Sequence, residues 1–144
     1  MGLSMNLTAE RFFWKDEDSG IKDKLKTIVD TDYDVDTVQM EIGYWRKSNA
    51  IHKWFVDNVQ HGVDDCSKYS VTEKQLQDLL QITKQAVVSK NPELILPCQS
   101  GFFFGLTDYG NYYKEDLNHT IEIIEKWLNF KDKSKYVVHY QSSW

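Results

Sequence analysis

Apolar and polar residues alternate at both ends of the chain, and this pattern leaves few folds open. Residues 3–8 and 38–44 alternate with a period of two, which predicts β-strands, and residues 12–13 are expected to extend the first strand. Residues 136–140 form a final predicted strand. Helical patterns lie between these strands without a regular strand–helix–strand alternation. We therefore predict an α+β domain with a mostly antiparallel sheet, in which the first two strands are neighbours.

About three helices are predicted between the outer strands. The first begins at Ser48 or Asn49, either of which suits an N-cap, and extends to about Gln60. The second covers residues 72–91 and begins with a capping box, in which a threonine is followed three residues later by a glutamine. The third covers residues 111–130, where apolar residues recur along one stripe.

A short aromatic run, Gly-Phe-Phe-Phe-Gly at residues 101–105, is predicted to be a buried strand. Alternation along such a strand would send Phe103 to one face of the sheet and Phe102 with Phe104 to the other. Both faces would then be aromatic, and each would need a cover. Helices could cover one face, while the acidic excursion, a partner subunit or a flat ligand would cover the other.

The negative charge of the chain is concentrated in one segment. Residues 14–38 contain eight acidic residues and four lysines, and so account for −4 of the formal net charge of −5. They include few large apolar residues, which is typical of a solvated connection. We therefore predict a single domain, residues 1–144, with an acidic and mobile excursion at about residues 14–37.

Part of this excursion matches the acidic positions of a calcium-binding loop. The acids from Asp30 to Asp36 stand at every second position, and Glu41 is the twelfth residue counted from Asp30. The sixth position of such a loop needs glycine for its sharp turn, but here it is Val35. The sequence favours an alternative, in which these acids lie on the solvent-exposed face of an edge strand. Their charges would then prevent association between sheets.

Several function classes find little support in the sequence. No apolar run reaches the roughly 18 residues of a membrane span, and the N-terminus does not resemble a signal peptide, so a cytoplasmic protein without membrane contacts is expected. Cys66 and Cys98 are too isolated for a zinc site or a disulfide framework. Net acidity argues against general nucleic-acid binding. Without a phosphate loop or a nucleophile elbow, no cofactor or metal is expected, and catalysis has no positive support.

The segment of residues 43–55 combines aromatic rings, cations and amides at a predicted strand-to-helix junction. Arg46 is one of only two arginines in the chain, and a guanidinium can hold a carboxylate or phosphate through two hydrogen bonds. The N-terminus of the following helix adds free N–H groups and the positive end of a helix dipole. An anion is therefore expected to bind here. The predicted anion-binding residues are Arg46, Lys47, Asn49, His52 and Lys53.

Aromatic residues around this junction could hold a planar ring. The chain contains 5 Trp, 8 Tyr and 7 Phe, and many of them lie in residues 43–55 and 101–113. Tyrosine and tryptophan suit both stacking and hydrogen bonding to a nucleobase or ribose. The predicted stacking residues are Tyr44, Trp45, Phe104, Tyr112 and Tyr113.

An ordinary structural role is the alternative for the same residues. In that interpretation Tyr44 and Trp54 belong to the core and Arg46 pairs with a surface acid. His52, which shares the other face of the helix with Lys53 and Val56, then faces solvent. The aromatic residues equally suit a protein interface, where Tyr, Trp and Arg are enriched.

Three stretches of sequence carry a family resemblance: Gly-Tyr-Trp-Arg-Lys at 43–47 with Asn49 and residues 51–60, then residues 101–105, and the ending Tyr-Gln-Ser-Ser-Trp at 140–144. With them the chain resembles a family of small proteins encoded by tailed phages and prophages, over most of its length except residues 14–38. This resemblance implies a place in the host cytoplasm, where small non-essential phage proteins often blunt host defence or redirect host metabolism. It implies no particular site or activity.

Three hypotheses about function follow. The leading one is a non-enzymatic binding protein that sequesters an anionic, ring-containing ligand such as a nucleotide immune signal, with a homo-oligomer as one form that it could take. The second, from another class, is a protein-interaction module that binds and inhibits a host protein. The third is a nucleotide phosphodiesterase that uses His52 or His139 as general base.

Overall fold

A computed structural model describes residues 2–14 and 19–144, and within them the chain forms one α+β domain, as predicted. No helix in this part of the chain is long and apolar enough to cross a bilayer. Two short 3-10 turns, at Pro92–Leu94 and Lys133–Lys135, accompany the main elements. In chain order the helices and strands are β1 (Ser4–Phe12), α1 (Ser19–Val29), β2 (Thr37–Arg46), α2 (Asn49–Asn58), β3 (Tyr69–Val71), α3 (Glu73–Val88), α4 (Asn111–Leu128) and β4 (Val137–Ser143).

The four strands form one antiparallel sheet in the order β2-β1-β4-β3. The first two strands are neighbours, as the sequence predicts, and β1 also pairs with β4. The β1–β4 pairing covers only Ser4 to Glu10, so the outer ends of β1 and β2 pair with each other alone. One irregularity, between Leu7 and Thr8, leaves Ile42 of β2 without an opposite residue.

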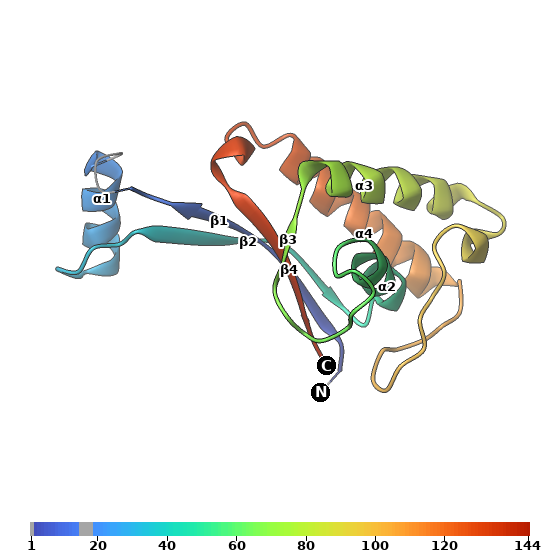
Figure 1. The fold of residues 1–144 in the computed structure, drawn as a ribbon. Coiled ribbons are helices and arrows are strands. Elements are labelled where there is room, and N and C mark those ends of the chain that lie inside the picture. Colours follow the sequence, from blue (N-terminus) through green and yellow to red (C-terminus); the bar gives the residue numbers. More distant parts are fainter. Residues whose placement is uncertain (1, 15–18) are drawn as a thin grey trace.

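One face of the sheet carries the core. Leu3, Met5, Leu7 and Ala9 are fully buried, whereas the residues between them on β1 are only half-buried. Helices α2, α3 and α4 gather on the buried side (Figure 1). The opposite side of β1 presents mainly polar residues. The sheet is therefore apolar on one face only, as an antiparallel sheet allows.

The predicted capping box at the start of α3 is present. Thr72 Oγ1 accepts from the Gln75 N–H, and the Gln75 side chain accepts from the Thr72 N–H. Helix α2 differs from its prediction, because the side expected to face water is also buried. His52 is fully buried and Val56 is 5 % exposed. The loop after α2 and the end of β4 cover this side, which local periodicity cannot reveal.

The aromatic run at residues 101–105 is not a strand, and this prediction was wrong. The segment is a loop in which Phe103 has a φ of +66° and Gly105 a φ of +90°, neither of which fits an extended strand. Phe102 is 82 % exposed, while Phe104 is buried. The glycines that flank the run therefore belong to turns of a loop that runs beside the N-terminus of α2.

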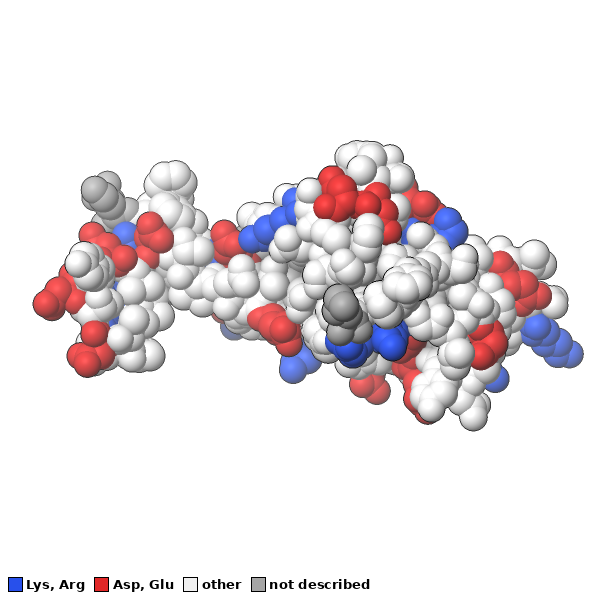
Figure 2. Space-filling view, turned by 90° about the horizontal axis from the view of Figure 1, so that it is seen from below, with Lys and Arg blue, Asp and Glu red and all other residues white. Residues whose placement is uncertain are grey.

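Much of the acidic segment forms part of an arm, which we define as residues 11–14 and 19–38. The outer ends of β1 and β2 project from the body, and α1 lies at their tip, apart from α2, α3 and α4 (Figure 1). A narrow neck joins this tip to the body, and acidic side chains lie over its surface (Figure 2). The sequence analysis did not predict α1, although Ile21, Leu25 and Ile28 follow a helical spacing. Residues 15–18 of the predicted excursion lie outside the described residues.

Candidate ligand-binding pocket

A pocket of about 600 Å³ opens beside the N-terminus of α2. Three parts of the chain form it: the junction between β2 and α2, the loop from Cys98 to Asp108, and the first turns of α4. Its lining residues are Arg46, Lys47, Ser48, Asn49, Ala50, Cys98, Gly105, Leu106, Asp108, Tyr112, Tyr113, Asp116 and Leu117.

The cationic side of the pocket is built where β2 ends and α2 begins. Arg46 is the last residue of β2, and Lys47 has a φ of +57°, which turns the chain sharply into the helix. The N–H groups of Ala50 and Ile51 in the first turn have no acceptor among the described residues. A helix start with free N–H groups next to an arginine and a lysine is a favourable environment for an anion.

Ser48, the N-cap residue of α2, contributes a buried hydroxyl. Ser48 is 1 % exposed, and its side chain caps no backbone N–H. Its Oγ makes no hydrogen bond of normal geometry with any described residue. The hydroxyl nevertheless lies close enough to Asp116 to lower the pKa of that carboxyl. Buried polar groups normally have partners, so a ligand is a natural partner for this hydroxyl.

Asp116 and Asp108 place acidic groups in the same pocket. Burial raises the pKa of the Asp116 carboxyl, an effect that Ser48 and the charge on His119 partly offset. Asp108 Oδ1 accepts from the Gly110 N–H at 2.9 Å and so helps to shape the turn before α4. The pocket therefore offers donors on its α2 side and carboxylates on its α4 side.

Asn49 shapes the pocket through its side chain. Its Nδ2 donates to the carbonyl oxygens of Phe104 and Leu106, at 3.1 and 2.8 Å, and its Oδ1 accepts from the Gln99 N–H at 3.0 Å. These three hydrogen bonds hold the loop of residues 99–106 against α2. The amide of Asn49 is thus a positioning group, because both of its N–H donors are already used.

Of the ten predicted site residues, five line this pocket. They are Arg46, Lys47, Asn49, Tyr112 and Tyr113. Tyr112 is 72 % exposed and presents its ring to solvent, whereas Tyr113 is buried and donates from its hydroxyl to the Leu96 carbonyl at 2.7 Å. Tyr112 can therefore stack on a ligand, and Tyr113 forms part of the pocket wall.

Three predicted site residues belong to the core instead. Trp45 is 2 % exposed, and its Nε1 donates to Thr120 Oγ1 at 2.9 Å. Phe104 is 5 % exposed, and its ring meets His52 edge-on with a centroid distance of 5.4 Å. His52 itself is fully buried. The assignment of these residues to a ligand is corrected here, because each of them is covered by other parts of the fold: Trp45 by α4, His52 by the loop after α2 and the end of β4, and Phe104 by its contacts with His52 and Trp144.

The remaining two predicted residues lie outside the pocket. Tyr44 is on the open side of the sheet, where hydrogen bonds with Ser4 and Arg46 lower the pKa of its phenol. Ser4 Oγ also accepts from Arg46 Nη1 at 3.3 Å. Lys53 pairs with Asp57 one turn later on α2, with a separation of 2.7 Å. Neither residue is part of the pocket lining.

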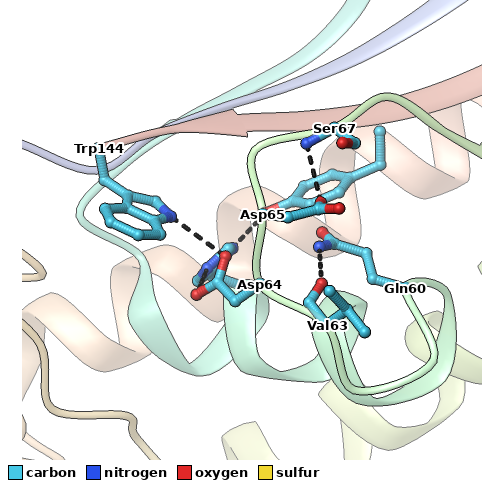
Figure 3. Close-up of polar contacts among 8 residues, drawn as sticks. Gln60, Val63, Asp64, Asp65, Ser67 and Trp144 are labelled. Carbon is cyan, nitrogen blue, oxygen red and sulfur yellow. Dashed lines mark hydrogen bonds and ion pairs between the residues drawn. The ribbon is translucent and has the colours of Figure 1, made fainter.

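His52 forms the centre of a second polar cluster, which is buried. Its Nδ1 lies 2.7 Å from the Tyr140 hydroxyl, and its Nε2 lies 2.9 Å from Asp64 Oδ2. Because a carboxylate can only accept, Nε2 carries the shared proton. Trp144 Nε1 donates to Asp64 Oδ1 at 3.1 Å, as Figure 3 shows. With both ring nitrogens engaged and no exposed surface, His52 is poorly placed to act as a general base.

The loop after α2, which contains Asp64, has two further contacts that fix its shape. Gln60 Nε2 donates to the Val63 carbonyl at 2.7 Å, and Asp65 Oδ1 accepts from the Ser67 N–H at 3.0 Å (Figure 3). These bonds place Asp64 over the buried side of α2. The cluster thus ties the end of β4 to α2, which is a structural role.

Sequence reasoning missed the acidic residues of the pocket. Tyr112 and Asp116 are four residues apart on α4, so they lie one above the other on the same helix face. This spacing was a usable signal for Asp116. Asp108, Gly105 and Leu106 come from the loop, and no local pattern relates that loop to the start of α2.

The calcium hypothesis receives no support from the fold. Glu41 lies inside β2 opposite Thr8, whereas Asp30 follows the end of α1. Within residues 2–14 and 19–144, no group of three or more His, Cys, Asp or Glu side chains is arranged to hold a metal ion.

In comparisons with known proteins, no family model, no curated protein and no solved structure matches the chain. The pocket must therefore be interpreted from its own geometry and chemistry.

Proposed function

We propose that this chain binds an anionic, ring-containing small ligand in the pocket at the N-terminus of α2. The observation that carries the proposal is the buried Ser48 hydroxyl, which makes no hydrogen bond of normal geometry with any described residue and lies near the Asp116 carboxyl and beside free helix N–H groups. Arg46 and Lys47 line the same pocket. Two cations, a hydroxyl and a helix N-terminus together favour a phosphate group.

Tyr112 and the two carboxylates extend this proposal to a nucleotide. Tyr112, which lines the same pocket as Arg46, provides an exposed ring on which a base can stack. Asp108 can accept a hydrogen bond from a sugar hydroxyl or from an N–H group of a base, and Asp116 can do so through one carboxyl oxygen in its ionised or its protonated form. A simple inorganic anion would gain nothing from these acids, whereas a nucleotide carries both negative charge and hydrogen-bond donors.

The sequence resembles small proteins encoded by phages. In a phage protein, such binding would sequester a nucleotide immune signal of the host and so act against host defence. The test is isothermal titration calorimetry of the full chain with a panel of cyclic nucleotides, with inorganic pyrophosphate as a probe for the anion alone. The bound material is then recovered by denaturation and separated by chromatography. Recovery of intact nucleotide supports sequestration, whereas recovery of a cleaved product would mean catalysis.

Arg46 provides the sharpest test. Arg46→Ala is expected to weaken nucleotide binding about tenfold or more, because a hydrogen bond to a charged group contributes about 1.5–3 kcal/mol. Lys90→Ala, which removes an exposed lysine away from the pocket, is the matched control. If both variants fold and bind equally well, the anion does not contact Arg46.

One observation favours the second hypothesis, a protein-interaction module. Phe102 and Phe103 are 82 and 44 % exposed on the loop beside the pocket, and their rings are in mutual contact with a centroid distance of 4.2 Å. Exposed aromatic residues of this kind are frequent anchors at protein interfaces. This second function replaces the first if two results are obtained together. The chain binds none of the nucleotides in the panel, and it binds a host protein that the Phe102→Ser variant no longer binds.

A further inference from the structure

The tip of the arm has apolar side chains that nothing in the body covers. Trp14, Ile28 and Val29 are 65, 78 and 59 % exposed. Helix α1 has eleven residues and lies apart from the other helices (Figure 1). Helices shorter than about 12 residues are marginal in water unless another surface packs against them. This tip is therefore suited to contact a second molecule.

The outer half of β2 is a free sheet edge. β1 is the only strand that pairs with β2 among the described residues. The Phe13 N–H donates to the Asp36 carbonyl, so the backbone groups at the alternate positions Thr37, Gln39 and Glu41 point away from β1. Further along β2, His119 Nε2 already donates to the Tyr44 carbonyl. The edge available for pairing is thus Thr37 to Glu41.

A small apolar pocket lies directly beside this free edge. It has a volume of about 240 Å³ and lies between β2 and the last turns of α4. Its lining includes four apolar residues, Met40, Ile42, Trp127 and Phe130, and also Lys126. The pocket is large enough to receive one or two aliphatic side chains.

Charge relates the arm to this end of α4. The described residues 19–38 of the arm contain five acidic residues and three lysines, whereas residues 126–135 contain four lysines and one aspartate. Lys126 and Lys131 form no ion pair with any described residue. Figure 1 shows this end of α4 on the side of the body from which the arm projects. An acidic arm and a basic α4 end are complementary if they belong to two copies.

We propose that a second copy of this chain is the occupant of both surfaces. The two β2 edges pair antiparallel, with Gln39 opposite Gln39 of the partner subunit. This register places Val38 opposite the partner's Met40 and Thr37 opposite the partner's Glu41, so that apolar residues meet and no like charges are opposed. The tip of each arm then extends past the partner's Glu41 to the apolar pocket and the lysines of α4. The proposal does not depend on the ligand of the other pocket.

Cysteine cross-linking tests the register. Gln39→Cys is made in a full chain that also carries Cys66→Ser and Cys98→Ser, and the protein is mildly oxidised. A residue on the two-fold axis faces its own copy at a Cα separation of about 5.5 Å, which a disulfide can span. The expected result is a disulfide-linked dimer. Gln85→Cys, at another exposed position, on α3, is the control, and equal cross-linking of both variants would overturn the proposal.

Sedimentation of the full chain at increasing concentration tests the arm. A reversible monomer–dimer equilibrium is expected, and Ile28→Asp should weaken it about tenfold or more because a charge would enter the apolar pocket. Val88→Asp places the same charge at an exposed apolar residue of α3 and should leave the equilibrium unchanged. A chain that stays monomeric throughout, or equal effects of the two variants, would overturn the proposal.

Discussion

His52 shows how far the role of one residue depends on its surroundings. In the sequence it stands among cations at a helix start, which suggested contact with an anion. In the structure Tyr140 and Asp64 occupy both ring nitrogens, and the residue is fully buried. Asn49 is similar, because its amide holds the loop at 99–106 and leaves no donor for a ligand.

The buried hydroxyl of Tyr140 is expected to contribute measurably to stability. Tyr140→Phe leaves His52 Nδ1 without a partner inside the core and should lower the free energy of unfolding by about 1–3 kcal/mol. Tyr112→Phe is the control, since that side chain is mostly exposed and should change stability by less than about 0.5 kcal/mol. Urea denaturation measures both, and similar losses for the two variants would contradict the role given to Tyr140.

Asp116 gives nucleotide binding a defined pH dependence. Burial raises the pKa of this carboxyl, so it takes up a proton as the pH falls through that raised pKa. Protonation removes a negative charge that opposes the bound anion. The affinity for a cyclic nucleotide, whose phosphodiester charge is constant in this range, should therefore rise as the pH is lowered towards the pKa.

Asp116→Asn checks this assignment by calorimetry at several pH values. The variant should bind more tightly than the parent chain near neutral pH, and its affinity should vary less with pH. Glu122→Gln removes an exposed acid from the same helix outside the pocket and should behave like the parent. Weaker binding by Asp116→Asn would mean that the ligand needs the charge of the ionised carboxylate, and would contradict the repulsion predicted between Asp116 and the bound anion.

At the scale of elements, the contact between β2 and α4 depends on a glycine. A Cβ added at Gly43 would lie 2.7 Å from Ile123 Cγ2, so the side chain that α4 presents here fits only against bare backbone. This contact fixes where α4 crosses the sheet. It thereby also positions Tyr112 and Asp116, which lie on the first turns of α4, relative to the start of α2.

Gly43→Ala is expected to destabilise the chain by about 1–3 kcal/mol, since overpacking a filled contact forces the neighbours apart. Gly20→Ala provides the control, because a Cβ at that position of α1 meets nothing within 4 Å. That second change should leave stability unchanged or raise it by up to about 1 kcal/mol. Thermal unfolding compares the two variants, and equal stabilities would contradict the tight contact at Gly43.

At the scale of the whole molecule, the arm and the ligand pocket lie at opposite ends of β1 and β2. The pocket contains Arg46 and Lys47 at one end of β2, while the arm begins beyond the β1–β4 pairing at the other. The two parts share the strands β1 and β2, but no residue of the arm lines the pocket. Their functions, ligand binding and self-association, are therefore expected to be separable.

Replacement of residues 12–37 by Asn-Gly tests this separation, because Arg11 and Val38 are opposite each other and this dipeptide favours a tight hairpin turn. The shortened chain should unfold cooperatively and bind a cyclic nucleotide within about twofold of the parent affinity, as expected for distant sites. Circular dichroism and calorimetry measure both properties. Loss of cooperative unfolding would show that the arm belongs to the folding core.

Local sequence pattern was sufficient for the strands and helices of the α+β class and for the capping box at Thr72, because each depends on residues close together in the chain. The pairing of β1 with β2 was predictable because consecutive strands usually lie side by side. It also located the cations and the helix start that line the pocket. The tertiary structure alone decided which side of α2 is buried, that residues 101–105 form a loop, and that Asp116 faces Ser48. These features depend on which distant segment covers which surface, and periodicity carries no information about such contacts.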